Sequence, residues 1–144
     1  VADIKNHEVV HREFFAAALG SAAIPKLAVD FSSVNFDSRD SVLLTAKALE
    51  DTGVGAYNGA AQFLRSGDYL EAAGKIVSVE GRHASAIRDI IGRSFAPNAF
   101  DGALTFEQVL RRAGPFIATP IALSHSPTAG QMAQRSADAQ EMDS

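Results

Sequence analysis

Residues 73–90 read AGKIVSVEGRHASAIRDI, and this stretch decides the fold. Its apolar residues recur every three or four positions, a spacing that predicts an α-helix with one apolar face. Glu80 and His83 interrupt that face at mid-length. Three positions apart on a helix, a carboxylate and an imidazole project from the same side, so both can reach one metal ion or a pair of ions.

The same Glu-x-x-His spacing occurs near the start of the chain, at Glu8 and His11. Residues 2–19 have helical periodicity around this pair, and residues 38–64 form a further apolar stripe that Glu50 interrupts. An unpaired carboxylate buried in a helix bundle costs several kcal/mol, so three inward glutamates predict bound cations. Carboxylates and imidazoles suit iron, manganese or zinc. We therefore expect a two-metal site with these ligands: Glu8, His11, Glu50, Glu80 and His83.

The connections between these helices differ in length. Residues 21–37 form a long crossover, after which Asp37 or Ser38 can cap the second helix. The connection to the third helix is short, which predicts that the second and third helices are antiparallel neighbours. A capping box of Asp68 and Glu71 is predicted to open the third helix, which runs to about residue 93.

Beyond the third helix the pattern weakens. Thr105 and Gln108 form another capping box, which predicts a short helix that ends at Gly114. We therefore expect three regions along the chain. They are the bundle helices (1–93), a loop with the short helix (94–115) and an extended polar C-terminal tail (116–144).

Composition excludes several classes of function. The 144 residues are enough for one domain, and 47% of them are hydrophobic, which argues against disorder. The net charge of -4, without any block of like charges, gives no reason to expect nucleic acid as a partner. The chain has no cysteine and therefore no thiolate metal site, and it has no apolar run long enough to span a membrane.

The order of these residues, a Glu-x-x-His pair, a lone glutamate and a second such pair, resembles the ferritin-like superfamily over about residues 2–93. Three stretches are similar, more narrowly, to the ferritin-like-domain family that includes desiccation-related proteins. These are His7 to Phe15, Glu50 to Ala61 and Tyr69 to Ile90. The resemblance implies an all-α, ferritin-like four-helix bundle with a long crossover.

The resemblance also implies roles for the site residues. Glu8 and Glu80 would bridge or cap two divalent ions, iron or manganese, with Glu50 as a terminal carboxylate. His11 and His83 would be the nitrogen ligands. Members of the superfamily act on peroxide or dioxygen, so an oxidoreductase is one expectation, and the narrower family implies a secreted or periplasmic protein.

This sequence departs from the family in one respect. The family's first helix contributes a further glutamate and should precede Glu8, but the sequence begins at Val1 with the helical pattern already running. Three explanations stay open: the helix is missing from the sequence, a neighbouring chain supplies it, or the site is incomplete and holds no metal. We therefore expect an exposed apolar strip beside the helix of Glu8, and a homo-oligomer or larger assembly.

A zinc hydrolase is one alternative, because His7 to His11 also spell the motif His-Glu-x-x-His. In such an enzyme both histidines bind zinc and Glu8 is the general base. That reading leaves the second Glu-x-x-His pair unexplained, so we interpret His7 as a residue on the rim of the two-metal site.

A non-catalytic scaffold or accessory subunit of a larger assembly, with a degenerate or empty metal site, is the other alternative. The small residues between Gly53 and Ala61 would let a neighbouring backbone approach closely. Tyr57 shares the face of Glu50, and we expect it near the site as a core aromatic residue.

Overall fold

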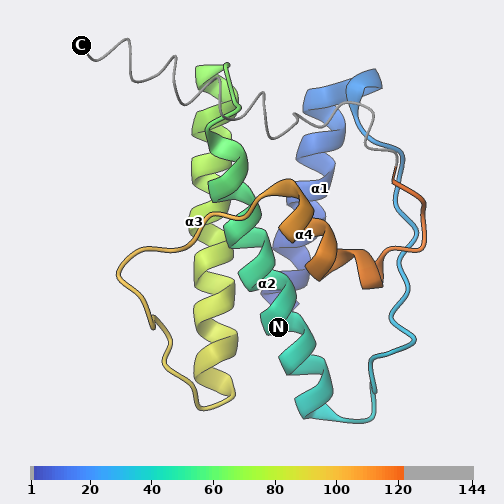
Figure 1. Ribbon diagram of the computed structural model, residues 1–144, viewed down its shortest axis with the longest axis vertical. Coiled ribbons are helices and arrows are strands. Elements are labelled where there is room, and N and C mark those ends of the chain that lie inside the picture. Colours follow the sequence, from blue (N-terminus) through green and yellow to red (C-terminus); the bar gives the residue numbers. More distant parts are fainter. Residues whose placement is uncertain (1, 122–144) are drawn as a thin grey trace.

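The computed structural model describes residues 2–121, which form helices and one isolated β-bridge. The helices are α1 (Ala2–Leu19), α2 (Arg39–Ala61), α3 (Gly67–Ile90) and α4 (Phe106–Ala113), with short 3-10 turns at Gly20–Ala22 and Gly114–Phe116. The predicted all-α fold, with three long helices and a short one, is confirmed (Figure 1). None of the described helices is long and apolar enough to cross a membrane.

Helices α2 and α3 pack against each other in opposite directions, as the short connection between them predicted (Figure 1). Their facing sides supply most of the buried apolar side chains because both helices have an apolar stripe. The core residues of this pair are Leu43, Val54, Ile76, Ala84 and Ile87. This pair is the framework on which Glu50, Glu80 and His83 are mounted.

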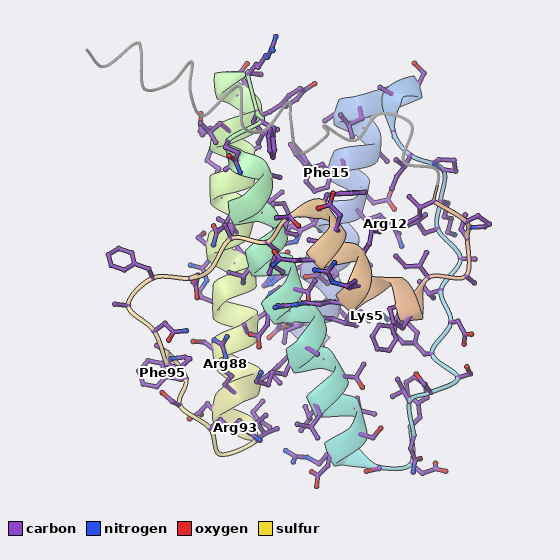
Figure 2. The ribbon with its side chains drawn as sticks, viewed as in Figure 1. Lys5, Arg12, Phe15, Arg88, Arg93 and Phe95 are labelled. Carbon is purple, nitrogen blue, oxygen red and sulfur yellow. The ribbon has the colours of Figure 1, made fainter. Side chains whose placement is uncertain are left out.

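An ion pair also joins α2 to α3. Arg88 of α3 donates to Asp51 of α2, which accepts a second hydrogen bond from Lys47 at 2.7 Å. Arg88 and Ser85 both donate to the carbonyl oxygen of Phe95, so the loop that follows α3 is held against the helix (Figure 2). Because Asp51 is the neighbour of Glu50, this ion pair fixes the register of the two helices next to the site.

Helix α1 lies beside this pair and runs in the same direction as α2, because the crossover returns along the length of the bundle (Figure 1). No residue of α1 is buried. Four of its large apolar side chains are 38–63% exposed: Val9, Val10, Phe14 and Leu19. Exposed apolar side chains are therefore present on α1, while the expected strip, and its coverage by a further helix or a second chain, stay predictions.

The helix caps agree with the sequence in two of three cases. Ser38 caps α2 by accepting from the backbone of Ser41, and Thr105 forms the predicted capping box with Gln108 at α4. The capping box of Asp68 and Glu71 was wrong. Ser66 is the cap of α3 and accepts from the backbone of Tyr69, while the side chain of Glu71 pairs with Lys75 one turn further on. Helix α3 therefore begins earlier than predicted, because serine two residues upstream offers an equally good cap.

Helix α4 packs against α2, and the glycines of α2 make this contact possible. The backbone nitrogen of Leu104 donates to the carbonyl oxygen of Gly55 at 2.8 Å. A Cβ at Gly59 would lie only 1.9 Å from the carbonyl oxygen of Leu104, so no larger residue fits there without movement. The predicted close approach to these small residues is thus made by a segment of the same chain.

The end of the described chain is paired with the crossover. Val29 and Ile117 form the isolated bridge, and the backbone nitrogen of Asp30 donates to Phe116 at 2.9 Å. The first residues of the predicted tail therefore pack against residues 28–30 and do not extend away. The remainder of that prediction, residues 122–144, lies outside the described residues.

Candidate metal centre

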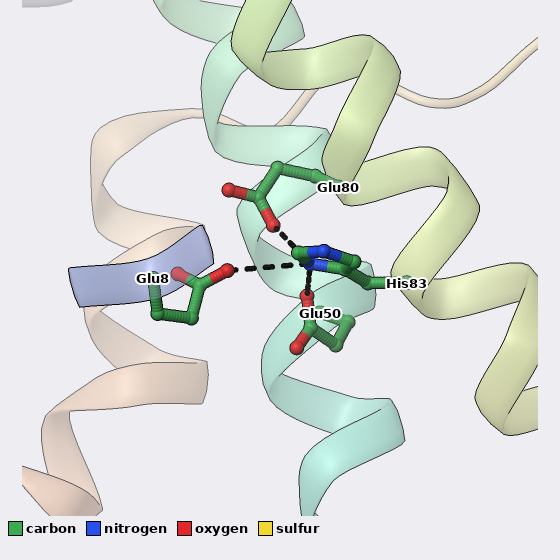
Figure 3. Close-up of side chains that lie close together, drawn as sticks. All are labelled: Glu8, Glu50, Glu80 and His83. Atoms are coloured by element: carbon green, nitrogen blue, oxygen red, sulfur yellow. Dashed lines mark ion pairs between the residues drawn. The ribbon is translucent and has the colours of Figure 1, made fainter. Parts of the chain in front are cut away.

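The three long helices bring four of the predicted ligands together at mid-length (Figure 3). Glu8 comes from α1, Glu50 from α2, and Glu80 and His83 from α3, and one ligand atom of each lies within 4.8 Å of the others. Nδ1 of His83 is at the centre. It lies 3.3 Å from a carboxylate oxygen of each of Glu8, Glu50 and Glu80.

His11, the fifth predicted ligand, borders this cluster on the side of α1. Its Nδ1 lies 3.0 Å from Oε1 of Glu80 and 3.8 Å from Oε1 of Glu8. Oε2 of Glu80 faces His83, so the two oxygens of this one carboxylate face two different histidines. That is the arrangement expected of a carboxylate that bridges two ions.

The spacing of the ligand atoms suits the binding of cations better than hydrogen bonds among the side chains. Nδ1 of His11 and Nδ1 of His83 are buried and have no hydrogen-bond partner among the described residues. Both lie near carboxylate oxygens, His11 at 3.0 Å from Glu80 and His83 at 3.3 Å from Glu8. Two ligand atoms that each lie about 2.1 Å from one ion are about 3.0–3.4 Å apart at octahedral or tetrahedral angles. The nitrogen-to-oxygen distances of His83 and of the His11–Glu80 pair match this spacing.

Electrostatics in the cluster favour neutral ligands as long as no cation is present. Burial, then a hydrogen bond shared with Glu80 and the charge of Glu8, raises the pKa of Glu50 to about 8. Burial and the charge of Glu80 also raise the pKa of Glu8. Burial lowers the pKa of His83, against the attraction of Glu8. A neutral imidazole keeps a free lone pair, which is the form that binds a metal.

The cluster is buried towards α3 and open towards α1. The side chains of Glu80 and His83 are 5% exposed, whereas the side chain of Glu8 is 47% exposed. Solvent and small solutes therefore reach the cluster past Glu8.

His7, which the sequence analysis interpreted as a rim residue, makes a contact that the sequence did not predict. Its Nδ1 lies 2.9 Å from Nε2 of His83, so it contacts a predicted ligand directly. The available signal was the spacing of His7 and His11, because residues four positions apart share one face of a helix. The geometry does not favour the zinc-hydrolase alternative. Glu8 lies within the carboxylate cluster, His7 faces α3, and the described residues form no β-strand that could bind a peptide.

Tyr57 lies near the cluster, as expected of a core aromatic residue. Its ring stacks on Phe15 of α1 with 6.2 Å between the ring centres. Burial, followed by the charges of Glu80 and Glu8, raises the pKa of its phenol. Tyr57 also lines an apolar cleft of about 350 Å³ between the three long helices.

Residues 1–93, which contain α1, α2 and α3 and therefore every residue of the cluster, match the family model described as Ferritin-like domain. A search of curated proteins found no match. The match covers more than half of the chain, and the helices that it spans supply the carboxylates and histidines at the spacings described above. The chain therefore belongs to the ferritin-like domain family.

Proposed function

We propose that this chain holds two divalent cations, iron or manganese, at the cluster of Glu8, His11, Glu50, Glu80 and His83. One observation carries the proposal. Two buried histidine nitrogens without hydrogen-bond partners among the described residues face the oxygens of glutamates from all three long helices. Such a pair of ions, when bound, supplies a Lewis-acidic and redox-active centre for the chemistry of peroxide or dioxygen.

The residues of the cluster divide the work. One carboxylate oxygen of Glu80 faces His11 and the other faces His83, so Glu80 would suit a position between the two ions. Glu50 must release its proton before it can bind a cation, because its raised pKa keeps it protonated near neutral pH. Glu8 is half exposed at the open side of the cluster, where it can exchange protons with solvent and contact a small molecule that enters.

The test is metal content followed by turnover. We expect the purified chain, loaded with Mn²⁺ or Fe²⁺ and desalted, to retain close to two ions by elemental analysis, and to consume hydrogen peroxide when loaded. Glu80→Gln should retain fewer ions. Glu71→Gln, an exposed substitution on the same helix, is the matched control and should behave as the parent. A parent chain that retains no more metal than Glu80→Gln would refute the proposal.

A non-catalytic scaffold is the second candidate, and the exposed apolar side chains of α1 favour it. A helix that buries none of its residues is a surface on which another helix or a second copy of the chain could pack. A chain that binds no metal, has a normal melting transition and forms a stable oligomer would support the scaffold. A chain that binds two ions but has no peroxide or dioxygen activity would support a structural metal role within such an assembly.

The cellular location is a proposal that rests on the resemblance alone. We propose a secreted or periplasmic protein, and fractionation of cells that express the full-length protein tests this.

A further inference from the structure

The contact between His7 and His83 joins α1 to α3 next to the cluster. The two rings are almost parallel, at 11°, with 5.1 Å between their centres and 2.9 Å between Nδ1 of His7 and Nε2 of His83. The distance between the ring centres is about the distance between the two nitrogens plus one ring radius on each side, so the nitrogens lie on the line that joins the centres. The rings therefore meet edge to edge in nearly one plane, which is the geometry of a hydrogen bond along a ring lone pair.

The surroundings of His83 decide which ring donates. A neutral imidazole carries one proton, on either Nδ1 or Nε2. If Nδ1 of His83 carried it, that proton would face the carboxylates of Glu8, Glu50 and Glu80 and would occupy the position that a cation needs. With the proton on Nε2, His83 donates to Nδ1 of His7, and the lone pair of its own Nδ1 faces the three carboxylates. Only the second arrangement leaves the lone pair of Nδ1 available to a cation.

We propose that His7 is a positioning residue for His83: it accepts a hydrogen bond from Nε2 and so fixes the tautomer and ring orientation in which Nδ1 points at the metal site. This inference rests on the proposed function. The partner of a metal-binding histidine is ordinarily a carboxylate, a backbone carbonyl or water. Here a second histidine takes that place, and it comes from the same helix as Glu8 and His11.

The position of His7 makes the role specific. His7 is exposed, whereas His83 is 5% exposed, so the contact shields the outer nitrogen of a buried ring from water. Water in place of His7 would accept the same hydrogen bond without holding the ring at one angle. Loss of a partner in this position lowers metal affinity by about 10- to 100-fold in well-studied sites.

Three substitutions separate positioning from packing. His7→Ala and His7→Leu remove the acceptor, whereas His7→Asn keeps an oxygen close to the place of Nδ1. Asn6→Ala, in the same turn of α1 and exposed, is the matched control. Alanine and leucine are better helix formers than histidine, so a loss of metal affinity in these variants cannot come from a lower helix propensity of α1.

The affinity is measured with Mn²⁺ alone, by the loss of the free-ion EPR signal in a titration of the full chain. We expect His7→Ala and His7→Leu to bind about 10- to 100-fold more weakly than the parent, and His7→Asn and Asn6→Ala to bind within a few-fold of it. Equal affinity of His7→Ala and the parent would overturn the proposal. Failure of His7→Asn to recover affinity would also overturn it, because His7 would then be a direct ligand.

A second measurement keeps this inference separate from the proposed function. Two-bond ¹H–¹⁵N correlation spectra of the metal-free chain report which nitrogen of each neutral imidazole carries the proton. We expect the Nε2–H tautomer of His83 in the parent and in His7→Asn, and a mixture of tautomers in His7→Ala. If the parent binds no Mn²⁺, the proposed function fails, while these spectra still decide whether His7 sets the tautomer. An Nδ1–H tautomer in the parent would overturn the positioning role.

Discussion

The thermal stability of this chain should fall as the pH rises in the absence of metal, whereas the stabilisation that bound metal adds should grow. Without metal, the raised pKa of Glu50 means that the folded chain holds a proton which the unfolded chain has already lost. This contribution to stability is complete below the unfolded pKa of 4.5 and is lost as the pH rises through about 8. With metal the carboxylates must be ionised, so binding strengthens as the pH rises.

The window from pH 6.5 to 8.5 separates the titration of Glu50 from that of His83. The pKa of His83 is lowered in the folded chain, so the unfolded chain takes up this proton first as the pH falls. His83 therefore reduces the stability only as the pH falls through 6.5. One pKa unit corresponds to about 1.4 kcal/mol, so release of the Glu50 proton across this window is worth at most about 2 kcal/mol. Water that enters past the exposed Glu8 screens the site, which reduces the expected change to roughly 1–2 kcal/mol. That corresponds to a fall of roughly 3–8 °C in Tm.

Melting curves by circular dichroism at pH 6.5, 7.5 and 8.5, in EDTA and in excess Mn²⁺, measure both trends. We expect Tm to fall with pH in EDTA, and the increase in Tm caused by Mn²⁺ to grow with pH. Glu50→Gln should flatten the dependence in EDTA, whereas Glu71→Gln, an exposed carboxylate on α3, should leave it unchanged. A flat or rising Tm in EDTA for the parent, or a slope that survives in Glu50→Gln, would refute the reasoning.

Four further substitutions test other parts of the structure. Glu80→Gln should lower Tm in metal-replete buffer, because a proposed metal ligand is lost. In EDTA it should leave Tm unchanged or raise it, because a buried like charge is removed. A variant that melts above the parent in metal-replete buffer would contradict a metal site. Gly59→Ala should destabilise the chain to urea by about 1–3 kcal/mol, because its Cβ meets the backbone of Leu104. Gly53→Ala, on the same helix with nothing within 4 Å, should stabilise it by roughly 0.5–1 kcal/mol. Tyr57→Phe should retain the metal content of the parent by elemental analysis, since the phenol has no hydrogen-bond partner among the described residues; reduced content would make Tyr57 part of the site.

The helical fold was predictable because the apolar residues of each long helix recur at the helical period. The stripe of α3 combines apolar residues at regular steps with an interruption by Glu80 and His83, and this pattern has no strand-like reading. The start of α3 was less predictable, since Ser66 and Asp68 are both acceptable caps and only tertiary packing selects one. Packing of Leu104 on Gly55 and Gly59 depends on a contact distant in sequence, which periodicity does not encode.

The cluster was predictable for a different reason. Five ionisable residues on apolar faces are costly unless they meet, so their joint position follows from energetics as well as from the resemblance. The role of His7 could not be predicted in the same way, because it lies at the rim of the site and its partner nitrogen belongs to another helix. Sequence spacing shows which side of a helix a residue occupies, but the rotation of α1 against α3 decides what that side touches.

Helix α1 shows how closely the site and the fold depend on each other. No residue of α1 is buried, so hydrophobic burial holds this helix only weakly, through contacts such as Phe15 on Tyr57. Polar residues of α1 also contact α3: His7 contacts His83, and His11 contacts Glu80. Two cations shared between α1 and α3 would therefore stabilise the arrangement where the apolar core contributes least. Binding of metal and placement of α1 would then be a single event, so the same carboxylates that repel one another in the empty cluster would hold the bundle together when it is filled.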